Sequence, residues 1–332
     1  MTAPEETAVG ALEGRRVLVT GGSGFIGSHL VRRLLREEAT VFAMTSSVSS
    51  VLPVRLAEVA GDVTIVEANV TDRSSMEHVA RQVQPEIVFN LAAFTHVGKS
   101  FQRVDENIQT NIQGTVNLLQ ALDGAYRRFV YVGTSEIYGD VPVPFREDGP
   151  VNPVSPYAVA KYAGERFCRM FQRAYGWPIT CIRPFNAYGP WQTPDRVIPE
   201  MILCALRKAP IAMTEGLQTR EFNFVEDLAD GLVRAATASA DGEVINLGCG
   251  REISMRDLAV LVLELMGNPV EARFGAIPHR PTEIWRMYAD ANKARELLGW
   301  APRHTLEEGL RATIDWYRSE LEGASKFLRV TT

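Results

Sequence analysis

The sequence lacks the marks of secreted, zinc-binding and membrane-spanning chains. Its cysteines are few, widely spaced and without a C-x-x-C pair: Cys168, Cys181, Cys204 and Cys249. Such thiols are typical of a reducing compartment and imply neither disulfides nor zinc. No apolar run approaches the ~18 residues of a membrane span. The N-terminus carries Glu5 and Glu6 where a secretory signal has a basic segment, so we expect a cytoplasmic protein with a flexible leader over 1–14.

A basic excess is missing as well. Lys and Arg number 35 against 40 Asp and Glu, a formal net charge of −5, and this balance argues against nucleic-acid binding. Hydrophobic residues make up 46% and charged residues 23% of the chain, which is typical of an ordered globular protein. The 332 residues suffice for two domains at roughly 150 residues each, or for one large α/β unit.

Short apolar runs alternate with helical patterns in the first half of the chain. Strands are expected over 16–20, 40–44, 63–67, 86–90, 129–134 and 179–183. Helices are expected between them over 25–37, 73–83 and 111–122. Strands that are apolar almost throughout are typical of a parallel sheet covered on both faces. With right-handed crossovers, the pattern predicts a doubly wound α/β fold over residues 15–183.

The pattern changes after Pro184, where helices dominate. They are expected over 197–208, 226–237, 255–266, 292–298 and 306–320, with short strand-like pieces at 221–225 and 244–247. Thr305 and Glu308 fit a capping box at the start of the last helix. We expect residues 184–332 to form a smaller, mostly helical substrate-binding lobe at the carboxyl ends of the strands. Some exchange of strands or helices between the two parts is expected.

A glycine-rich turn joins the first strand to the first helix. Its sequence is Gly21-Gly22-Ser23-Gly24-Phe25-Ile26-Gly27. Glycines allow a tight turn and bring backbone N–H groups near a pyrophosphate, and the helix N-terminus supplies partial positive charge. Strand, turn and helix follow in the order of a Rossmann dinucleotide site. The expected cofactor contacts are Gly21, Ser23, Gly24, Phe25, Ile26 and Gly27.

The end of the second strand bears on the choice of cofactor. In an NAD-binding site this position carries an acid that holds a ribose 2′-hydroxyl, but the chain has Thr45, Ser46 and Ser47. Serine hydroxyls suit the 2′-phosphate of NADP when a cation lies near. The candidate cations are Arg32, Arg33 and Arg55. We therefore expect NADP or NAD, with NADP slightly favoured.

A tyrosine and a lysine four residues apart form a candidate catalytic pair. Tyr157 and Lys161 lie in a helical stretch, so both side chains project from one face. A phenol with a pKa near ~10 is a poor base at neutral pH, and a neighbouring ammonium is expected to lower that pKa. Thr134 and Glu136 end the fifth strand, and in an extended segment they face the same side. Alternatively, Glu136 has no catalytic role and only caps a backbone amide.

Several motifs resemble those of the extended short-chain dehydrogenase/reductases, and most closely the nucleotide-sugar 4,6-dehydratases of the GDP-mannose type. The resemblance runs from the glycine turn to Gly299-Trp300. Its more specific parts are LAAFTHV at 91–97, TSE at 134–136, RPFNAYGP at 183–190, QTR at 218–220 and RPTE at 280–283.

The resemblance implies a redox-neutral dehydration. Tyr157 takes the proton of the 4-hydroxyl of a nucleotide-diphosphate hexose while hydride passes to the nicotinamide, and Lys161 holds the nicotinamide ribose. Glu136 then removes the proton of carbon 5, water leaves from carbon 6, and the hydride returns to carbon 6. The tightly bound cofactor is thus recycled in each turnover. Many dehydratases have Asp where this chain has Ser135, so Glu136 acts first as base and then as acid.

The resemblance also implies ligand contacts. Further cofactor contacts are Ser46, Ser47, Asn69, Val70, Leu91, Ala92, Ala93 and Pro184. Substrate contacts are Thr95, Asn186, Arg196, Val197, Arg220 and Arg280. Among these, Arg220 and Arg280 are diphosphate ligands, because arginine forks match phosphate oxygens. No metal is expected.

Other outcomes stay open. The Thr134-Ser135-Glu136 string also occurs in UDP-glucuronate decarboxylases, and the 4-epimerases share the 4-keto intermediate. A third alternative is a non-catalytic cofactor-binding scaffold, against which the intact Tyr157–Lys161 pair argues. Family members pair through helices near 111–122 and 157–175, which implies a homodimer built on a four-helix bundle. Neither nucleic acid nor membrane is an expected partner.

Overall fold

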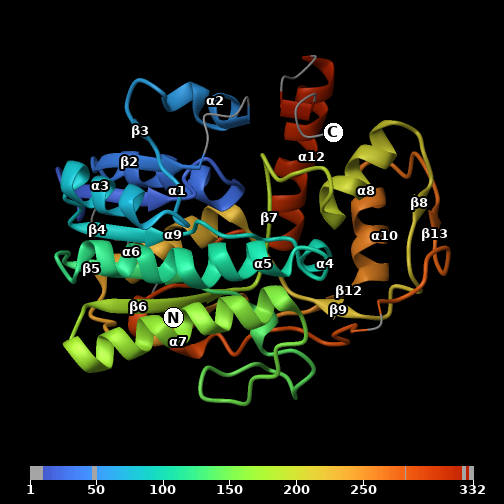
Figure 1. The fold of residues 1–332 in the computed structure, drawn as a ribbon. Helices are drawn as coiled ribbons and strands as arrows, with labels where there is room; N and C mark the ends of the chain where they lie inside the picture. The colour runs from blue at the N-terminus through green and yellow to red at the C-terminus, as the bar shows by residue number, and fades with distance from the viewer. Residues whose placement is uncertain (1–9, 47–50, 281, 324–326, 329–332) are drawn as a thin grey trace.

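A seven-stranded parallel sheet forms the centre of the molecule (Figure 1). The computed structural model describes residues 10–46, 51–280, 282–323 and 327–328. The strand order is β11-β6-β5-β4-β1-β2-β3, and all neighbours in this sheet are parallel. The strands are β1 (Arg16–Thr20), β2 (Thr40–Thr45), β3 (Thr64–Glu67), β4 (Ile87–Asn90), β5 (Arg128–Val132), β6 (Ile179–Pro184) and β11 (Val244–Leu247).

Helices cover both faces of this sheet, which confirms the doubly wound fold. The helices on one face share a buried apolar core with the strands and are α1 (Phe25–Arg36), α9 (Val225–Thr237) and α11 (Asn292–Leu298). Those on the other face form a second core and are α3 (Arg73–Val83), α6 (Gly114–Leu122) and α7 (Pro156–Tyr175). Because both faces are covered, the strands are apolar on both sides.

A smaller helical lobe lies beside the sheet. Its helices are α8 (Val197–Leu206), α10 (Met255–Leu265) and α12 (Leu306–Glu322), and they share a separate apolar core. Short strand pairs join this lobe, namely β7 (Asn186–Tyr188) with β10 (Phe222–Phe224), β9 (Thr219–Arg220) with β12 (Ile253–Ser254), and β8 (Ile211–Ala212) with β13 (Ala272–Arg273). The chain returns from the lobe to the sheet for α9 and the edge strand β11, and returns again for α11 before it enters α12. The capping box of Thr305 and Glu308 is present at α12.

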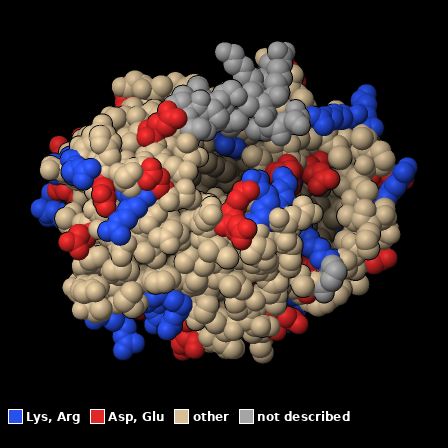
Figure 2. All heavy atoms as spheres, viewed as in Figure 1, with Lys and Arg blue, Asp and Glu red and all other residues tan. Residues whose placement is uncertain are grey.

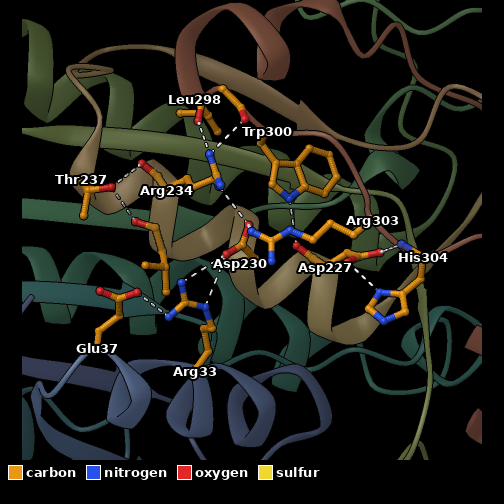
Figure 3. A network of polar contacts seen from close by, with 12 residues as sticks. Arg33, Glu37, Asp227, Asp230, Arg234, Thr237, Leu298, Trp300, Arg303 and His304 are labelled. Carbon is orange, nitrogen blue, oxygen red and sulfur yellow. Dashed lines mark hydrogen bonds and ion pairs between the residues drawn. The ribbon is translucent and has the colours of Figure 1, made fainter. Parts of the chain in front are cut away.

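An ion-pair network fastens α1 to α9 and to the chain that precedes α12 (Figure 3). Arg33 of α1 and Arg234 of α9 both bind the carboxylate of Asp230. One turn earlier on α9, the buried carboxylate of Asp227 binds Nδ1 of His304 at 2.9 Å. Removing one partner of such a pair leaves a buried charge unpaired, which costs roughly 3–5 kcal/mol. The network therefore holds α9 firmly between the sheet and the lobe.

Two local conformations near the carboxyl ends of the strands differ from the sequence predictions. Strand β5 ends at Val132, and Ser135–Ile137 is a turn of 3₁₀-helix in place of the expected extended segment. Thr134 caps this turn by accepting a hydrogen bond from the N–H of Glu136. The helix expected over 111–122 begins earlier, with α5 (Val104–Asn107) and a π-helical turn, Ile108–Gln113, before α6. In the described part of the chain, every helix is too short or too polar to span a bilayer.

Candidate active site

The glycine-rich turn leaves no room for side chains at its narrowest points. A Cβ at Gly27 would lie 2.2 Å from the carbonyl oxygen of Gly21, and one at Gly22 would lie 2.9 Å from the Cβ of Ala43. Gly24 caps α1 without a side-chain hydrogen bond, and the first turn of α1, which contains Phe25 and Ile26, holds no acid. The helix N-terminus thus keeps its positive partial charge for an anion. The turn fits a dinucleotide pyrophosphate.

The end of β2 meets this turn. Ser23 donates a hydrogen bond from Oγ to Oγ1 of Thr45 at 3.1 Å, which joins the glycine-rich turn to the end of β2. Ser46 is exposed at the end of the strand. Ser47 lies outside the described residues.

The candidate arginines near the turn differ in what they bind. Arg33 forms ion pairs with Glu37 and Asp230. Arg55, in contrast, contacts the glycine-rich turn. The side chain of Arg55, 6% exposed, donates from Nε to the carbonyl of Trp191 at 3.1 Å and from one terminal nitrogen to the carbonyl of Ser23 at 3.2 Å. Its other terminal nitrogen is buried and has no hydrogen-bond partner among the residues that the structure describes. Burial lowers the pKa of Arg55 to about 10.

The segment after β4 is held from two sides. The hydroxyl of Thr20 accepts hydrogen bonds from the N–H groups of Leu91 and Ala92 at 3.1 and 3.0 Å. The amide side chain of Asn111 binds both the N–H and the carbonyl of Phe94. Between them lies Ala93, which is partly exposed. The segment is therefore fixed at the carboxyl end of the sheet, where ligands of such folds bind.

Asn69 and Val70 follow β3 at the same end of the sheet. The amide of Asn117 in α6 donates to the carbonyl of Val70 at 2.9 Å, and a Cβ at Gly114 would meet the side chain of Val70 at 2.7 Å. The side chain of Asn69 accepts from the N–H of Thr71. The fit of α6 against this loop depends on glycine at position 114.

Three of the predicted catalytic residues form one cluster. The hydroxyl of Thr134 lies close enough to the phenol of Tyr157 to lower its pKa, and the carboxylate of Glu136 lies close enough to raise it. Burial raises the pKa of Glu136, opposed by the fields of Arg220 and Arg280. The hydroxyl of Ser135 points elsewhere, to the sulfur of Met287 at 3.6 Å.

The pKa of Tyr157 is raised, where the sequence predicted that the ammonium of Lys161 would lower it. Burial raises this pKa to about 12, and the nearby hydroxyl of Thr134 only partly opposes the rise. The ammonium of Lys161 lies over the ring of Tyr131, 4.6 Å from its centre, while the hydroxyl of Tyr131 donates to the carbonyl of Lys161 at 2.8 Å. Burial also lowers the pKa of Lys161 to about 8. The cost of desolvating each group exceeds the effect of its neighbours.

The predicted substrate residues lie on two sides of the cluster. On one side, Arg220 binds the carboxylate of Glu283 and the carbonyl of Ile284, and Arg280 is exposed. Because Arg220 and Arg280 both act on the pKa of Glu136, they face the same space. Asn186 donates to the carbonyl of Glu221, so its amide is already engaged. The face viewed in Figure 2 is hollowed, with charged side chains of both signs around the hollow.

On the other side, Thr95 and Arg196 meet. A guanidinium nitrogen of Arg196 lies 3.4 Å from the hydroxyl of Thr95, although the two residues are far apart in the sequence. The field of Arg196 also lowers the pKa of Tyr157. Val197 begins α8 directly afterwards and is exposed, and Pro184 ends β6.

The sequence analysis missed a buried ion pair beneath the cluster. Glu165 of α7 and Arg183 of β6 are 1% and 2% exposed and form two hydrogen bonds. Arg183 was noted only as the first residue of a motif. The spacing in the sequence indicated that Glu165 belongs with this site. Tyr157, Lys161 and Glu165 are each four residues apart, which places them on one face of a helix. Asn111 was missed too, because its clamp on Phe94 depends on the π-helical turn.

Comparisons with known proteins agree with this geometry. Residues 17–248 match the family described as "NAD dependent epimerase/dehydratase family". The dTDP-glucose 4,6-dehydratase of Neisseria meningitidis is 34% identical over 330 residues, covering 91% of this chain and 93% of that protein. The structure of the dTDP-glucose 4,6-dehydratase DesIV from Streptomyces venezuelae, with NAD bound, has a TM-score of 0.86 at 30% identity, covering 94% of this chain and 99% of that one.

An epimerase is equally similar in structure. The UDP-glucose 4-epimerase from Thermotoga maritima, with UDP-glucose, has a TM-score of 0.86 at 32% identity and covers 92% of this chain and 99% of that one. The resemblance drawn from the sequence motifs is thereby confirmed. The family match over residues 17–248 and the similarity to these relatives show that the chain belongs to the NAD dependent epimerase/dehydratase family.

Proposed function

We propose that this protein is a nucleotide-sugar 4,6-dehydratase. The observation that carries the proposal is the place of Glu136, a carboxyl group in a buried setting beside Tyr157 and close to Thr134. Oxidising and re-reducing an alcohol requires no carboxylate at that point. Eliminating water does require one, because the proton of carbon 5 must be removed once carbon 4 is a ketone.

The chain's own residues divide the proton transfers. Thr134 and Tyr157 bind the sugar 4-hydroxyl, and Tyr157 removes its proton. A nicotinamide cofactor bound at the glycine-rich turn would supply the hydride chemistry that links carbon 4 and carbon 6. Because burial raises the pKa of Glu136, its carboxylate is a stronger base and its acid form a ready donor to the leaving 6-hydroxyl. Ser135 is directed toward Met287, so the same carboxyl group serves both steps.

The diphosphate of the substrate is assigned to the arginines beside Glu136. Arg220 and Arg280 supply the positive field there, and a diphosphate has the charge to take the place of Glu283 on Arg220. Thr95, Asn186, Arg196 and Val197 line the remaining substrate positions in this proposal. Charge-assisted arginine forks account for binding of a diphosphate in general, whichever nucleobase it carries.

The preferred cofactor in this proposal is NADP. Its support is the missing acid after β2 and the buried Arg55. One terminal nitrogen of Arg55 binds the carbonyl of Ser23, and the other has no hydrogen-bond partner in the described part of the chain. On cofactor-free protein, Arg55→Met is expected to weaken NADP binding about tenfold or more, as for loss of a charge-assisted hydrogen bond, and to change NAD binding little. Calorimetric titration measures both affinities. Arg36→Met, at an exposed position of α1, controls for net charge. Equal losses for the two cofactors would refute the NADP assignment.

We further propose a homodimer through α7 and its neighbours. Large apolar side chains are exposed on α5, the π-helical turn and α7, namely Val104, Ile108, Val159, Phe167 and Met170. Since α7 packs against both α5 and the π-helical turn, these side chains form one patch, and exposed patches of this kind mark association surfaces. Met170→Asp is expected to give monomers in light scattering. Val260→Asp, on an equally exposed site of α10, is expected to leave the mass unchanged.

One experiment separates the possible outcomes. The purified protein is incubated with a panel of nucleotide sugars and NAD(P), and the products are examined by mass spectrometry. A dehydratase product lacks one water, a decarboxylase product lacks carbon dioxide, and an epimerase product keeps the mass of its substrate. Loss of water from any hexose of the panel supports the proposal. If the protein only isomerises or decarboxylates its substrates and removes water from none of them, the proposal is overturned.

A further inference from the structure

The face of α7 that carries Tyr157 and Lys161 continues one turn further to a buried acid. Glu165 follows Lys161 at the spacing of helical neighbours and is 1% exposed. Its two carboxylate oxygens accept hydrogen bonds from Nε and a terminal nitrogen of Arg183 at 2.9 and 2.7 Å. The helix of the candidate catalytic pair is thus tied to the end of β6 by a forked contact.

The same guanidinium reaches the segment that carries Glu136. Its remaining terminal nitrogen donates to the hydroxyl of Tyr138 at 2.7 Å. Tyr138 is the residue that ends the 3₁₀ turn over Ser135–Ile137, two positions after Glu136. The hydroxyl of Tyr138 donates in turn to the side-chain oxygen of Asn246 in β11 at 2.8 Å. One guanidinium therefore stands between the helix of Tyr157 and the turn of Glu136.

The geometry of this contact is rigid. A guanidinium is planar, and its donors point in fixed directions, so satisfying Glu165 on one edge sets where the hydroxyl of Tyr138 must lie. The ring of Tyr138 is stacked on Phe145 with ring centres 4.7 Å apart, which prevents it from turning away. Arg183 itself is 2% exposed, so water does not replace a lost partner easily.

We infer that Arg183, bound between Glu165 and Tyr138, is a positioning residue for the elimination step. It fixes the place of the Glu136 turn relative to the Tyr157–Lys161 helix, while touching neither substrate nor cofactor. The inference rests on the proposed dehydratase function. Disturbing the link on the Tyr138 side is expected to misplace Glu136 and to leave Tyr157 and Lys161 in position, so that oxidation of carbon 4 continues while elimination slows.

The variant Tyr138→Phe tests this directly, because it removes one hydroxyl and keeps both the ring and the Glu165–Arg183 pair. With substrate present, the expected result is a kcat reduced about tenfold, as for loss of one charge-assisted hydrogen bond, and a KM changed little. Reduced cofactor and the 4-keto hexose should accumulate before water is lost. Tyr126→Phe is the matched control, since the buried hydroxyl of Tyr126 has no hydrogen-bond partner within the described residues and its side chain belongs to the apolar core that includes residues of α6 and β5.

A second variant guards against a purely structural effect. Arg183→Lys keeps the charge but cannot bind Glu165 and Tyr138 together in one plane, so it is expected to show the same accumulation of reduced cofactor. If both variants only lower the melting temperature and retain wild-type partition between oxidation and elimination, the positioning role is refuted. If the wild-type protein itself removes no water from any nucleotide sugar, the proposed function fails instead, and the two failures are distinguishable.

Discussion

The hydroxyl of Thr134 lies beside the phenol of Tyr157 and lowers its pKa. It opposes burial, which raises the pKa of Tyr157 to about 12, and so favours the phenolate that deprotonation of a sugar hydroxyl requires. The two residues come from different elements, since Thr134 caps the 3₁₀ turn after β5 and Tyr157 lies in the first turn of α7. The relationship gives Thr134 a function that can be tested separately from substrate binding.

The substitution Thr134→Val is expected to raise the pKa of Tyr157 further, because it removes the hydroxyl that lowers this pKa and favours the phenolate. Each unit of pKa corresponds to about a tenfold change, so kcat at neutral pH should fall about tenfold. The limb of the pH–rate profile on which activity rises with ionisation of Tyr157 should move to higher pH. Thr237→Val, at an exposed position late in α9, should leave the profile as it is. An unshifted profile in Thr134→Val would contradict this role.

Glu136→Gln is expected to reduce formation of the dehydrated product by roughly 10²–10⁴-fold, the range for loss of a general acid–base group. The amide keeps the size of the side chain, so the affinity for the cofactor should change by no more than about twofold. A twofold change in affinity corresponds to a change in binding free energy of under about 1 kcal/mol. Product is measured by mass spectrometry and cofactor affinity by calorimetry. Glu264→Gln on the exposed side of α10 serves as control. Unchanged turnover in Glu136→Gln would defeat the elimination mechanism.

The pKa of Lys161 predicts a pH dependence of cofactor binding. Burial lowers this pKa from 10.5 to about 8, so the ammonium is present below about pH 8 and is lost as the pH rises through that value. If Lys161 holds the nicotinamide ribose as proposed, the affinity of cofactor-free protein should decline above pH 8, well before an exposed lysine would titrate. Lys161→Met should bind weakly at all pH values and show no such decline. Wild-type affinity that stays constant to pH 10 would rule out the assignment.

Gly27→Ala is expected to abolish tight cofactor binding. Its Cβ would lie 2.2 Å from the carbonyl oxygen of Gly21, so the turn must shift, and overpacking of this kind costs about 1–3 kcal/mol. A lower melting temperature and a cofactor affinity reduced at least about tenfold are the expected results. Gly61→Ala is the matched control, because a Cβ there meets nothing within 4 Å. Normal cofactor binding by Gly27→Ala would argue against the pyrophosphate site.

The strands and most helices were predictable because both faces of the sheet are covered. The apolar runs at β1 and β4 predict strands, and the amphipathic pattern of α3 predicts a helix, from the local sequence alone. Two conformations near the site differ from the sequence predictions, because neither can be inferred from the periodicity of hydrophobic residues. The 3₁₀ turn after β5 depends on the Thr134 cap, and the π-helical turn places Asn111 where its amide reaches Phe94. The first is a local cap that hydrophobic periodicity does not indicate, and the second brings together two segments that are 17 residues apart in the sequence.

The candidate site was predictable to the extent that its residues form motifs. Gly27, Tyr157 and Glu136 were identified from spacing alone or from the family resemblance. The pKa of Tyr157 was predicted in the wrong direction because burial, which a sequence does not state, outweighs the neighbouring charge. The partners of Arg183 were not predictable either, because Glu165 and Tyr138 lie in elements that only the folded chain brings together.

The edge strand β11 has a consequence for how the chain is made. Residues 244–247 pair with β6 and supply Asn246 to Tyr138, yet they are synthesised long after the rest of the sheet. While the ribosome is still translating that region, β6 presents unpaired N–H and C=O groups, a template for pairing between nascent chains. A fragment that stops at residue 183 should therefore self-associate, and the two halves of the chain should not be exchangeable as independent modules.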